Sequence, residues 1–440
     1  MTTSLKNAGV WGSDFGSVSF VIRNMSCDNY KAKYFKLFGE QGEVNSNQEL
    51  IETFRASEPY SVTLAQLSNI SGFPLSYWAL PEIIQLFSKP SLAETFESGG
   101  RCKTTNDEVY MRRLWEVSNQ SIGVEGTWVL TAKGGAFRRY FGNVDTVIKW
   151  DRPAKDFYRS VGGITNSRFW DKPGITWSIV SAKGGAAFRY KDSGVQYNSV
   201  APTIFLKEEE KEFYKTLVFL NSNIVNEFVG ALSPTFAVNV GEVLKIPYIE
   251  SLDDELEGLG KRLVTIFRSD WDSQEVSIDY KRNLLISNKQ TSIKASFEKL
   301  CISRQKLEKE VNNCQIKIDN LIENSLGITL SSNIAELSDN LIFNTSFDSD
   351  ISDLLSYYVG CMMGRYSLDR EGLIYANSGN EGFKELEAGD AYKTIPADDD
   401  GIVPLASEDW LFDDDATTRF KEFVETVWGG EHCNRSAGPY

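Results

Sequence analysis

The chain lacks several features on which common classes of enzymes and membrane proteins depend. His432 is the only histidine among 440 residues, so a histidine base or a His-rich metal site is not expected. No apolar run reaches the roughly 18–20 residues of a membrane span, and the N-terminus has no signal-peptide core. The six cysteines show no CxxC spacing, which is typical of reduced thiols. These absences predict a cytoplasmic protein that contacts no membrane.

Motifs for catalysis and cofactor binding are also missing. No two prolines are adjacent, so there is no Asp/Asn-Pro-Pro-Tyr/Phe loop to hold an exocyclic amine. P-loop, HExxH and GxSxG sequences are absent, and Gly9, Gly12 and Gly16 precede a predicted strand instead of following one. Aspartates cluster at 398–400 and 413–415 without EF-hand spacing, which favours a solvated or partner-docking face. We therefore assign no catalytic, cofactor-binding or metal-binding residue, and whether the chain is an enzyme stays open.

Charge is distributed unevenly along the sequence. The net charge is −15. Residues 101–192 contain 16 Lys and Arg against 9 Asp and Glu, a balance of +7, whereas residues 331–440 contain 7 against 22, a balance of −15. A local excess of positive charge can attract a polyanion to one part of a protein that is acidic as a whole. The basic region 101–192 is therefore the predicted nucleic-acid-binding part.

A repeat lies inside this basic region. Residues 131–140, Thr-Ala-Lys-Gly-Gly-Ala-Phe-Arg-Arg-Tyr, return at 181–190 as Ser-Ala-Lys-Gly-Gly-Ala-Ala-Phe-Arg-Tyr, and each copy follows an apolar run headed by tryptophan. The pattern predicts a strand, a glycine turn and a strand, formed twice. Each turn would carry a lysine at its tip, with an arginine and an exposed tyrosine just beyond. Two hairpins with solvated tips and no ligand are the alternative interpretation.

The candidate DNA-binding residues are the basic, amide and aromatic side chains in these hairpins and in the segment that precedes them. Such side chains bind phosphates and read base edges. The set is Arg101, Lys103, Asn106, Arg112, Arg113, Lys133, Arg138, Arg139, Tyr140, Lys183, Arg189 and Tyr190.

The periodicity of the remaining sequence predicts a mixture of strands and helices. Short β-branched and aromatic runs predict strands, and apolar spacings of three and four predict helices. Apolar residues form one stripe from Ile293 to Leu321, which Arg304 interrupts, so we favour packing within the protein over an isolated coiled coil. A helix of about 30 residues would be about 45 Å long, a suitable spacer between domains. The predicted strands are 18–24, 33–38, 143–150 and 204–206, and the predicted helical regions are 47–55, 213–232 and 255–322.

An ordered series of motifs resembles one protein family. The series is similar to the target-recognition region and the segments that follow it in PglX, the adenine-specific DNA methyltransferase of BREX phage-defence systems. The similarity runs from about residue 12 to 429. Its main motifs are Gly72-Phe73-Pro74-Leu75-Ser76-Tyr77-Trp78, Arg113-Leu114-Trp115-Glu116-Val117, Lys133-Gly134-Gly135, Phe219-Leu220-Asn221-Ser222, Asp270-Trp271-Asp272-Ser273 and Gly360-Cys361-Met362-Met363-Gly364-Arg365-Tyr366.

The resemblance implies an α+β fold, with a mixed β-rich target-recognition domain, a long-helix spacer and a mainly helical acidic C-terminal region. The implied domains are 1–58 (closing strands of a methyltransferase-like domain), 59–250 (DNA target recognition), 251–330 (helical spacer) and 331–440 (acidic region). Family members carry a methyltransferase domain ahead of this part. This chain is therefore expected to be a C-terminal piece, or a split or truncated member. S-adenosylmethionine is expected only with a separate or upstream methyltransferase domain.

The expected partners are double-stranded DNA, a methyltransferase domain or subunit, and other BREX proteins. The recognition part would select the sequence while a catalytic domain takes the flipped adenine. One alternative is a non-catalytic adaptor in a defence complex that docks proteins through its acidic C-terminal region. An independent hydrolase is a third interpretation, which no assembled site supports. The long helix is expected to separate the basic and acidic regions by more than a Debye length of about 8–10 Å.

Overall fold

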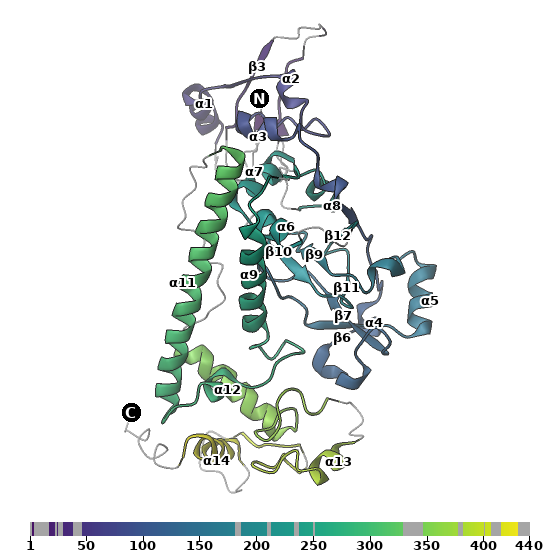
Figure 1. Cartoon of the computed structure of the whole chain (residues 1–440), viewed down its shortest axis with the longest axis vertical. Coiled ribbons are helices and arrows are strands. Elements are labelled where there is room, and N and C mark those ends of the chain that lie inside the picture. The colour runs from purple at the N-terminus through teal and green to yellow at the C-terminus, as the bar shows by residue number, and fades with distance from the viewer. Residues whose placement is uncertain are drawn as a thin grey trace. The chain divides into compact units, whose positions relative to one another are not determined.

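The computed structural model describes residues 2–3, 17–22, 24, 30–37, 46–180, 186–208, 213–232, 237–249, 251–328, 346–376, 382–399, 401–405 and 415–429. The chain forms two compact units, shown with their elements in Figure 1. The first unit is Met1–Glu97 with Asn223–Ser251, and the second is Ser98–Ser222 with Leu252–Tyr440. Within the described ranges, no helix combines the length and the apolar character needed to cross a membrane. The boundaries of the four predicted domains stay a prediction.

The first unit is built around a small two-stranded sheet. β3 (Lys31–Tyr34) pairs antiparallel with β4 (Tyr60–Thr63), and α1 (Asn47–Ala56) lies between them in the sequence, which confirms the helix predicted at 47–55. The rings of Tyr34 and Tyr77 stack at 4.7 Å over a small apolar core. The other elements are β1 (Thr2–Thr3), β2 (Ser17–Val18), α2 (Leu64–Leu67), α3 (Pro81–Leu86), η1 (Leu92–Glu94), α7 (Asn223–Leu232) and α8 (Val240–Val243).

The strand predicted at 18–24 is shorter than expected. β2 covers only Ser17–Val18 and pairs with the two-residue β1. Residues 19–22 lie outside any strand, and Phe20, Val21 and Ile22 are exposed. A two-stranded pair of this size cannot organise a longer strand, because a strand needs neighbours and an apolar face to be stable.

The second unit contains a sheet with the order β11-β7-β8-β6. Its centre is the antiparallel pair β7 (Trp128–Ala132) and β8 (Thr146–Lys149). β6 (Met111–Arg113) pairs antiparallel with β8, and β11 (Gln196–Tyr197) pairs parallel with β7. The strand predicted at 143–150 is confirmed in β8. The helix α5 (Arg152–Ser160) follows it and is not among the predicted helical regions. Asp151 caps its N-terminus and accepts from the Ala154 amide at 2.9 Å.

A second sheet in this unit has the order β10-β9-β12. β9 (Gly174–Trp177) is buried throughout and pairs antiparallel with β10 (Phe188–Lys191) and with β12 (Thr203–Leu206). The strand pairing predicted for the second copy of the repeat is therefore confirmed. Its glycine tip at 181–185, which includes Lys183, lies outside the described residues. β5 (Phe96–Ser98) lies at the boundary of the two units.

The first copy of the repeat does not form the predicted hairpin. β7 ends at Ala132, and residues 133–145 reach β8 without a strand. The chain turns at Gly135 (φ +110°) and again at Tyr140 (φ +63°). Tyr140 then lies along β10, because its amide donates to the Phe188 carbonyl and its carbonyl accepts from the Tyr190 amide, each at 2.8 Å. The copies therefore lie next to each other instead of forming two separate hairpins.

Asn221 fixes β10 to the helix that follows the sheets. α6 (Phe213–Leu220) ends just before this residue. The Asn221 side chain accepts from the Phe188 amide at 3.0 Å and donates to the Phe188 carbonyl at 2.9 Å, so it takes the place of a neighbouring strand. Both residues are buried. The Phe219-Leu220-Asn221-Ser222 motif thus has a structural role.

We expect Asn221→Ala to lower the free energy of unfolding by about 1–3 kcal/mol, because it leaves the buried Phe188 amide without its acceptor. Denaturant unfolding followed by circular dichroism measures this change. Asn288→Ala is the matched control. The side-chain amide of Asn288 donates to the Leu284 carbonyl of its own helical turn at 3.0 Å, so its loss leaves no strand without a partner. Equal stability of the two variants would contradict the role given to Asn221.

Helices form the rest of the second unit. α9 (Glu255–Trp271) packs against α6, and α11 (Ile293–Leu326) runs beside α9 (Figure 1). Gly327, in the left-handed region at φ +65°, ends α11. The predicted long helix is therefore confirmed, and so is the α+β fold class. The remaining helices are α4 (Asp107–Tyr110), η2 (Leu114–Glu116), η3 (Asn119–Ser121), η4 (Ser167–Phe169), α10 (Leu284–Ser287), α12 (Phe347–Met362), α13 (Phe383–Ala388) and α14 (Ala416–Trp428).

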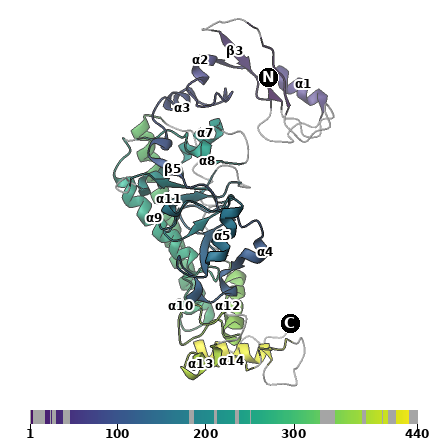
Figure 2. The same ribbon diagram turned by 90° about the vertical axis from the view of Figure 1, so that its right-hand side faces the viewer.

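The acidic C-terminal region packs against the long helix. Leu285 of α10, Leu300 of α11, Leu354 of α12 and Phe423 of α14 lie in one buried cluster. Figure 2 shows the helices α10, α12 and α14 gathered at one end of the second unit. Arg304, which breaks the apolar stripe, is buried and forms a two-pronged ion pair with Asp350 at 2.6 and 2.8 Å. The described part of the acidic region is therefore a helical layer on one end of α11. The helix acts here as a packing partner.

Candidate nucleic-acid interface

The predicted DNA-binding residues fall into two groups by burial. Arg138, Arg139, Tyr140 and Arg189 are buried, so the exposed placement expected just beyond each turn is wrong for these four residues. The second group reaches the surface. Lys183 belongs to neither group, because it lies outside the described residues. Arg101, Asn106 and Arg113 are exposed, and Lys103, Arg112, Lys133 and Tyr190 are half-buried.

Arg138 joins the repeat to α9. Its guanidinium donates to the Phe267 carbonyl at 2.9 Å and to Asp270 Oδ2 at 2.7 Å, and it lies 5.2 Å from the centroid of the Trp271 ring. The side chain of Arg138 is 1% exposed, whereas that of Asp270 is 11% exposed. Burial lowers the pKa of Arg138, and the Asp270 carboxylate opposes this shift. The Asp270-Trp271-Asp272-Ser273 motif therefore supplies the partners of a buried arginine.

Arg189 of the second copy lies beside Arg138 of the first. Its guanidinium donates to the Arg138 carbonyl at 3.3 Å and to Ser178 Oγ at 3.4 Å. Burial and the nearby Arg138 cation lower the pKa of Arg189 to about 9. The hydroxyl of Tyr140 donates to Gln315 Oε1 of α11 at 2.7 Å. The repeat thus contributes a buried cluster, here called the arginine cluster (Arg138 and Arg189), that connects the sheets to the helices.

Several of the surface residues also have local structural roles. The Asn106 side chain caps α4 by accepting from the Val109 amide at 3.3 Å. Arg113 forms an ion pair with Asp145. The Tyr190 ring stacks on Tyr214 at 5.5 Å, so it is already covered on one face.

Among the described candidate DNA-binding residues, Arg101 and Lys103 have the fewest side-chain partners. Neither forms an ion pair with a described residue. Their backbone is fixed, because the Cys102 amide donates to the Tyr197 carbonyl at 3.3 Å and the Lys103 amide donates to the Gly163 carbonyl at 2.7 Å. Two positive charges therefore stand on a segment held by the sheet.

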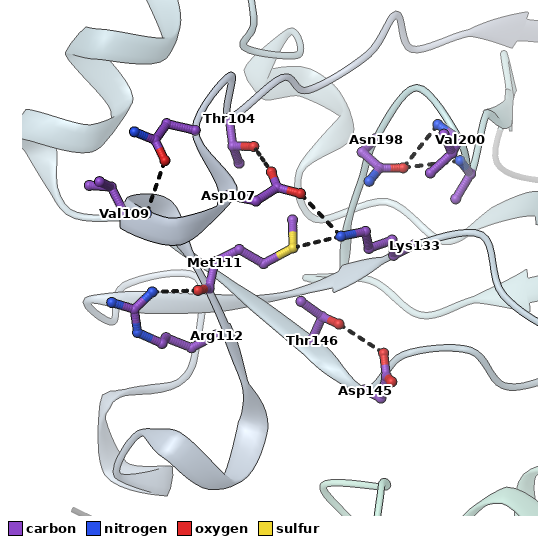
Figure 3. Close-up of polar contacts among 12 residues, drawn as sticks. Thr104, Asp107, Val109, Met111, Arg112, Lys133, Asp145, Thr146, Asn198 and Val200 are labelled. Atoms are coloured by element: carbon purple, nitrogen blue, oxygen red, sulfur yellow. Dashed lines mark hydrogen bonds and ion pairs between the residues drawn. The ribbon is translucent and has the colours of Figure 1, made fainter. Parts of the chain in front are cut away.

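A pocket of about 270 Å³ has Lys103 in its lining, and Arg101 precedes the pocket residue Cys102 in the chain. Figure 3 shows its polar contacts, in which Asp107 of α4 and Lys133 at the end of β7 point toward each other. Thr131 also lines the pocket, and its buried hydroxyl has no hydrogen-bond partner among the described residues. The lining residues are Cys102, Lys103, Thr104, Thr105, Asp107, Met111, Thr131, Lys133, Ile148, Asn198, Ser199 and Val200.

The pocket has an ion pair at its rim and an apolar floor. Lys133 Nζ lies 3.2 Å from Asp107 Oδ2 and 3.1 Å from Met111 Sδ. The hydrogen bond from Thr104, together with the Lys133 ammonium, lowers the pKa of Asp107, so a carboxylate stands here at neutral pH. Burial raises the pKa of the Cys102 thiol to about 12, which excludes it as a nucleophile. The pocket is therefore equipped for binding through a cation, an anion and an apolar surface.

The sequence missed parts of this surface. Asp107, Met111 and Thr131 carry no binding signal of their own, since they meet only in the fold. The helix α5 adds the exposed Arg152 and Arg159, which a search for helix caps around Asp151 and Pro153 would have found. No cluster of potential metal ligands occurs among the residues that the structure describes.

Comparison with known proteins identifies the relatives of the chain. No family model matches it. It is 35% identical over 442 residues to the adenine-specific methyltransferase BrxX of Escherichia coli O9:H4 (strain HS), with 96% of this chain covered. It is 27% identical over 463 residues to the adenine-specific methyltransferase PglX of Lacticaseibacillus casei (strain Zhang), with 97% covered. The chain spans about a third of these relatives, 36% and 37% of their lengths. The resemblance that the motifs carry is therefore confirmed, and this chain is a PglX-like protein related to part of two adenine-specific methyltransferases.

Proposed function

We propose that this chain is the DNA target-recognition part of a PglX-like N6-adenine methyltransferase that acts in cytoplasmic BREX phage defence. The observation that carries the proposal is a pocket lined by Lys103 and Lys133, with groups able to contact bases, together with the exposed Arg101 two residues before Lys103. Phosphate contacts position a protein on DNA, and groups in reach of the base edges then read the sequence.

A methyltransferase domain or subunit would perform the chemistry. The chain has no Asp/Asn-Pro-Pro-Tyr/Phe sequence, so its residues do not fit a site for the target adenine or for S-adenosylmethionine. The recognition part would hold the duplex while the adenine is flipped into that other domain. Other BREX proteins are proposed as further partners.

Gel-shift titration of the whole chain on a duplex at two salt concentrations tests the proposal. We expect binding that weakens steeply with salt, because each neutralised phosphate releases condensed counterions. Binding without a salt slope, or no binding at all, would overturn the proposed function.

Arg101→Ala combined with Lys103→Ala is expected to weaken binding on all sequences alike. The slope of log K against log[salt] should fall by roughly one unit for each lost phosphate contact. The matched control is Lys306→Ala with Lys309→Ala, which removes the same charge from exposed positions on α11. A control pair that lowers the slope as much as the test pair would show that total charge, and not this surface, governs binding.

A second candidate function is an adaptor that docks another protein. Leu355, Val359 and Met363 recur four residues apart at α12 and are 40%, 48% and 40% exposed. A row of this kind suits contact with another helix. An adaptor would show no salt-dependent DNA binding in the same titration.

A further inference from the structure

The Asp107–Lys133 ion pair offers a donor and an acceptor side by side at the rim of the pocket. The two side chains are 57% and 42% exposed, so a ligand can reach both. An exposed ion pair of this kind contributes little to stability. Each group keeps hydrogen-bonding capacity, because an ammonium has three donors and a carboxylate accepts several bonds.

The elements hold the two groups in fixed positions. Thr104 donates to Asp107 Oδ1, which turns Oδ2 toward Lys133 (Figure 3). Lys133 directly follows β7, and Met111 begins β6 of the same sheet. A reading group gains precision when its side chain is held by a rigid element. Met111, Lys133 and Asp107 therefore present an apolar group, a donor and an acceptor that meet at the Lys133 ammonium.

A T·A base pair presents groups complementary to these three in the major groove. Thymine offers its methyl group and then the O4 acceptor, and adenine offers the N6 amino donor. O4 and N6 are joined by the Watson–Crick hydrogen bond, about 2.9–3.0 Å long. The 3.2 Å separation of Lys133 Nζ and Asp107 Oδ2 matches this spacing.

A G·C pair fits less well in the same orientation. It also offers an acceptor beside a donor, O6 of guanine and N4 of cytosine, and lysine commonly binds guanine. However, guanine places the N7 acceptor where thymine has its methyl group. That polar atom would face Met111 and the apolar floor of Cys102, Ile148 and Val200. A polar group buried there without a donor would cost binding free energy.

We propose that Asp107, Lys133 and Met111 read one T·A base pair of the target, with Lys133 donating to thymine O4, Asp107 accepting from adenine N6 and Met111 packing on the thymine methyl. This assignment rests on the proposed DNA-recognition function. It separates base reading by the ion pair from phosphate binding by Arg101 and Lys103.

Selection from a randomised duplex library, with the whole chain, tests the assignment. We expect one fixed position to be T·A. Asp107→Ala and Lys133→Ala should each reduce the preference there by about tenfold, as for the loss of one base-reading contact. Deoxyuridine in place of that thymidine should weaken binding by about fourfold, the effect of one buried methyl group. Met111→Ala should abolish only this sensitivity to the methyl group.

The controls distinguish this assignment from the proposed function. Lys306→Ala should leave every preference unchanged, and circular dichroism should show each variant folded. Salt-dependent DNA binding with preferences that Asp107→Ala and Lys133→Ala do not alter would overturn the base-pair assignment alone. Selection of G·C, with loss of that preference in both variants, would overturn the thymine assignment. Absence of DNA binding by the unaltered chain would overturn the proposed function and the assignment together.

Discussion

Arg304→Met is expected to lower the free energy of unfolding by about 3–5 kcal/mol, because it leaves the Asp350 carboxylate buried without its cation. The side chains of Arg304 and Asp350 are 11% and 5% exposed and make two parallel hydrogen bonds. The pair joins α11 to α12, so its loss should loosen the described acidic layer from the long helix. Denaturant unfolding, with circular dichroism as the signal, measures the change.

Two controls make this prediction specific. Arg262→Met breaks another two-pronged ion pair, between Arg262 of α9 and Glu310 of α11. The side chains of this pair are 49% and 32% exposed. We expect a loss of about 1 kcal/mol or less there. The double variant Arg304→Met with Asp350→Leu removes both charges and should recover most of the stability. A single Arg304 variant as stable as the Arg262 variant would contradict the buried pair.

Asp270→Ala is the second change for which we expect a large effect, again about 3–5 kcal/mol. It removes the carboxylate that pairs with Arg138, and it leaves the two cations of the arginine cluster close together in the interior. The fields of these cations already oppose each other, since Arg138 contributes to the lowered pKa of Arg189. Thermal and denaturant unfolding should both show the loss.

Asp192→Ala is the comparison for this site. Asp192 pairs with Arg268, which lies on α9 as Asp270 does, but the side chains of Asp192 and Arg268 are 35% and 33% exposed. We therefore expect Asp192→Ala to lower the free energy of unfolding by about 1 kcal/mol or less. If the Asp270→Ala chain folds with unchanged stability but no longer binds DNA, the structural role given to Arg138 is contradicted, and the sequence-based prediction that Arg138 binds DNA is favoured.

The arginines of the repeat show why part of the predicted site was wrong. Lysine, glycine and arginine in two similar segments are typical of a surface that binds a polyanion. The partners of Arg138 lie about 130 residues later in the chain, and nothing within the repeat indicates them. Burial of a charged side chain depends on such distant partners, so local sequence predicts it poorly.

Features that rest on local periodicity were predicted well. The long helix follows from apolar residues three and four apart and from Gly327 at its end. Arg304 interrupts the apolar stripe of this helix because it pairs with Asp350 of α12, which the local periodicity does not indicate. The helix α5 was missed because Pro153 and several charged residues conceal its short apolar face, although Asp151 and Pro153 are ordinary signals of a helix start.

The pocket could not have been predicted residue by residue. Asp107, Lys133 and Asn198 come from separate parts of the chain, and their meeting depends on the pairing of β6, β7 and β8. The charge of residues 101–192 indicated the region that contains most of the pocket, and Lys103 and Lys133 line it. That these residues bind DNA stays a prediction.

The bond between Asn221 and Phe188 has a consequence for self-association. β10 is at one end of its sheet, and an unprotected edge strand offers free amides and carbonyls to another chain. Asn221 and Tyr140 occupy the outward backbone groups of Phe188, and Tyr140 also engages the amide of Tyr190. These bonds block the addition of another strand at this edge. The side chain of the single residue Asn221 thus helps to protect the protein from edge-to-edge aggregation.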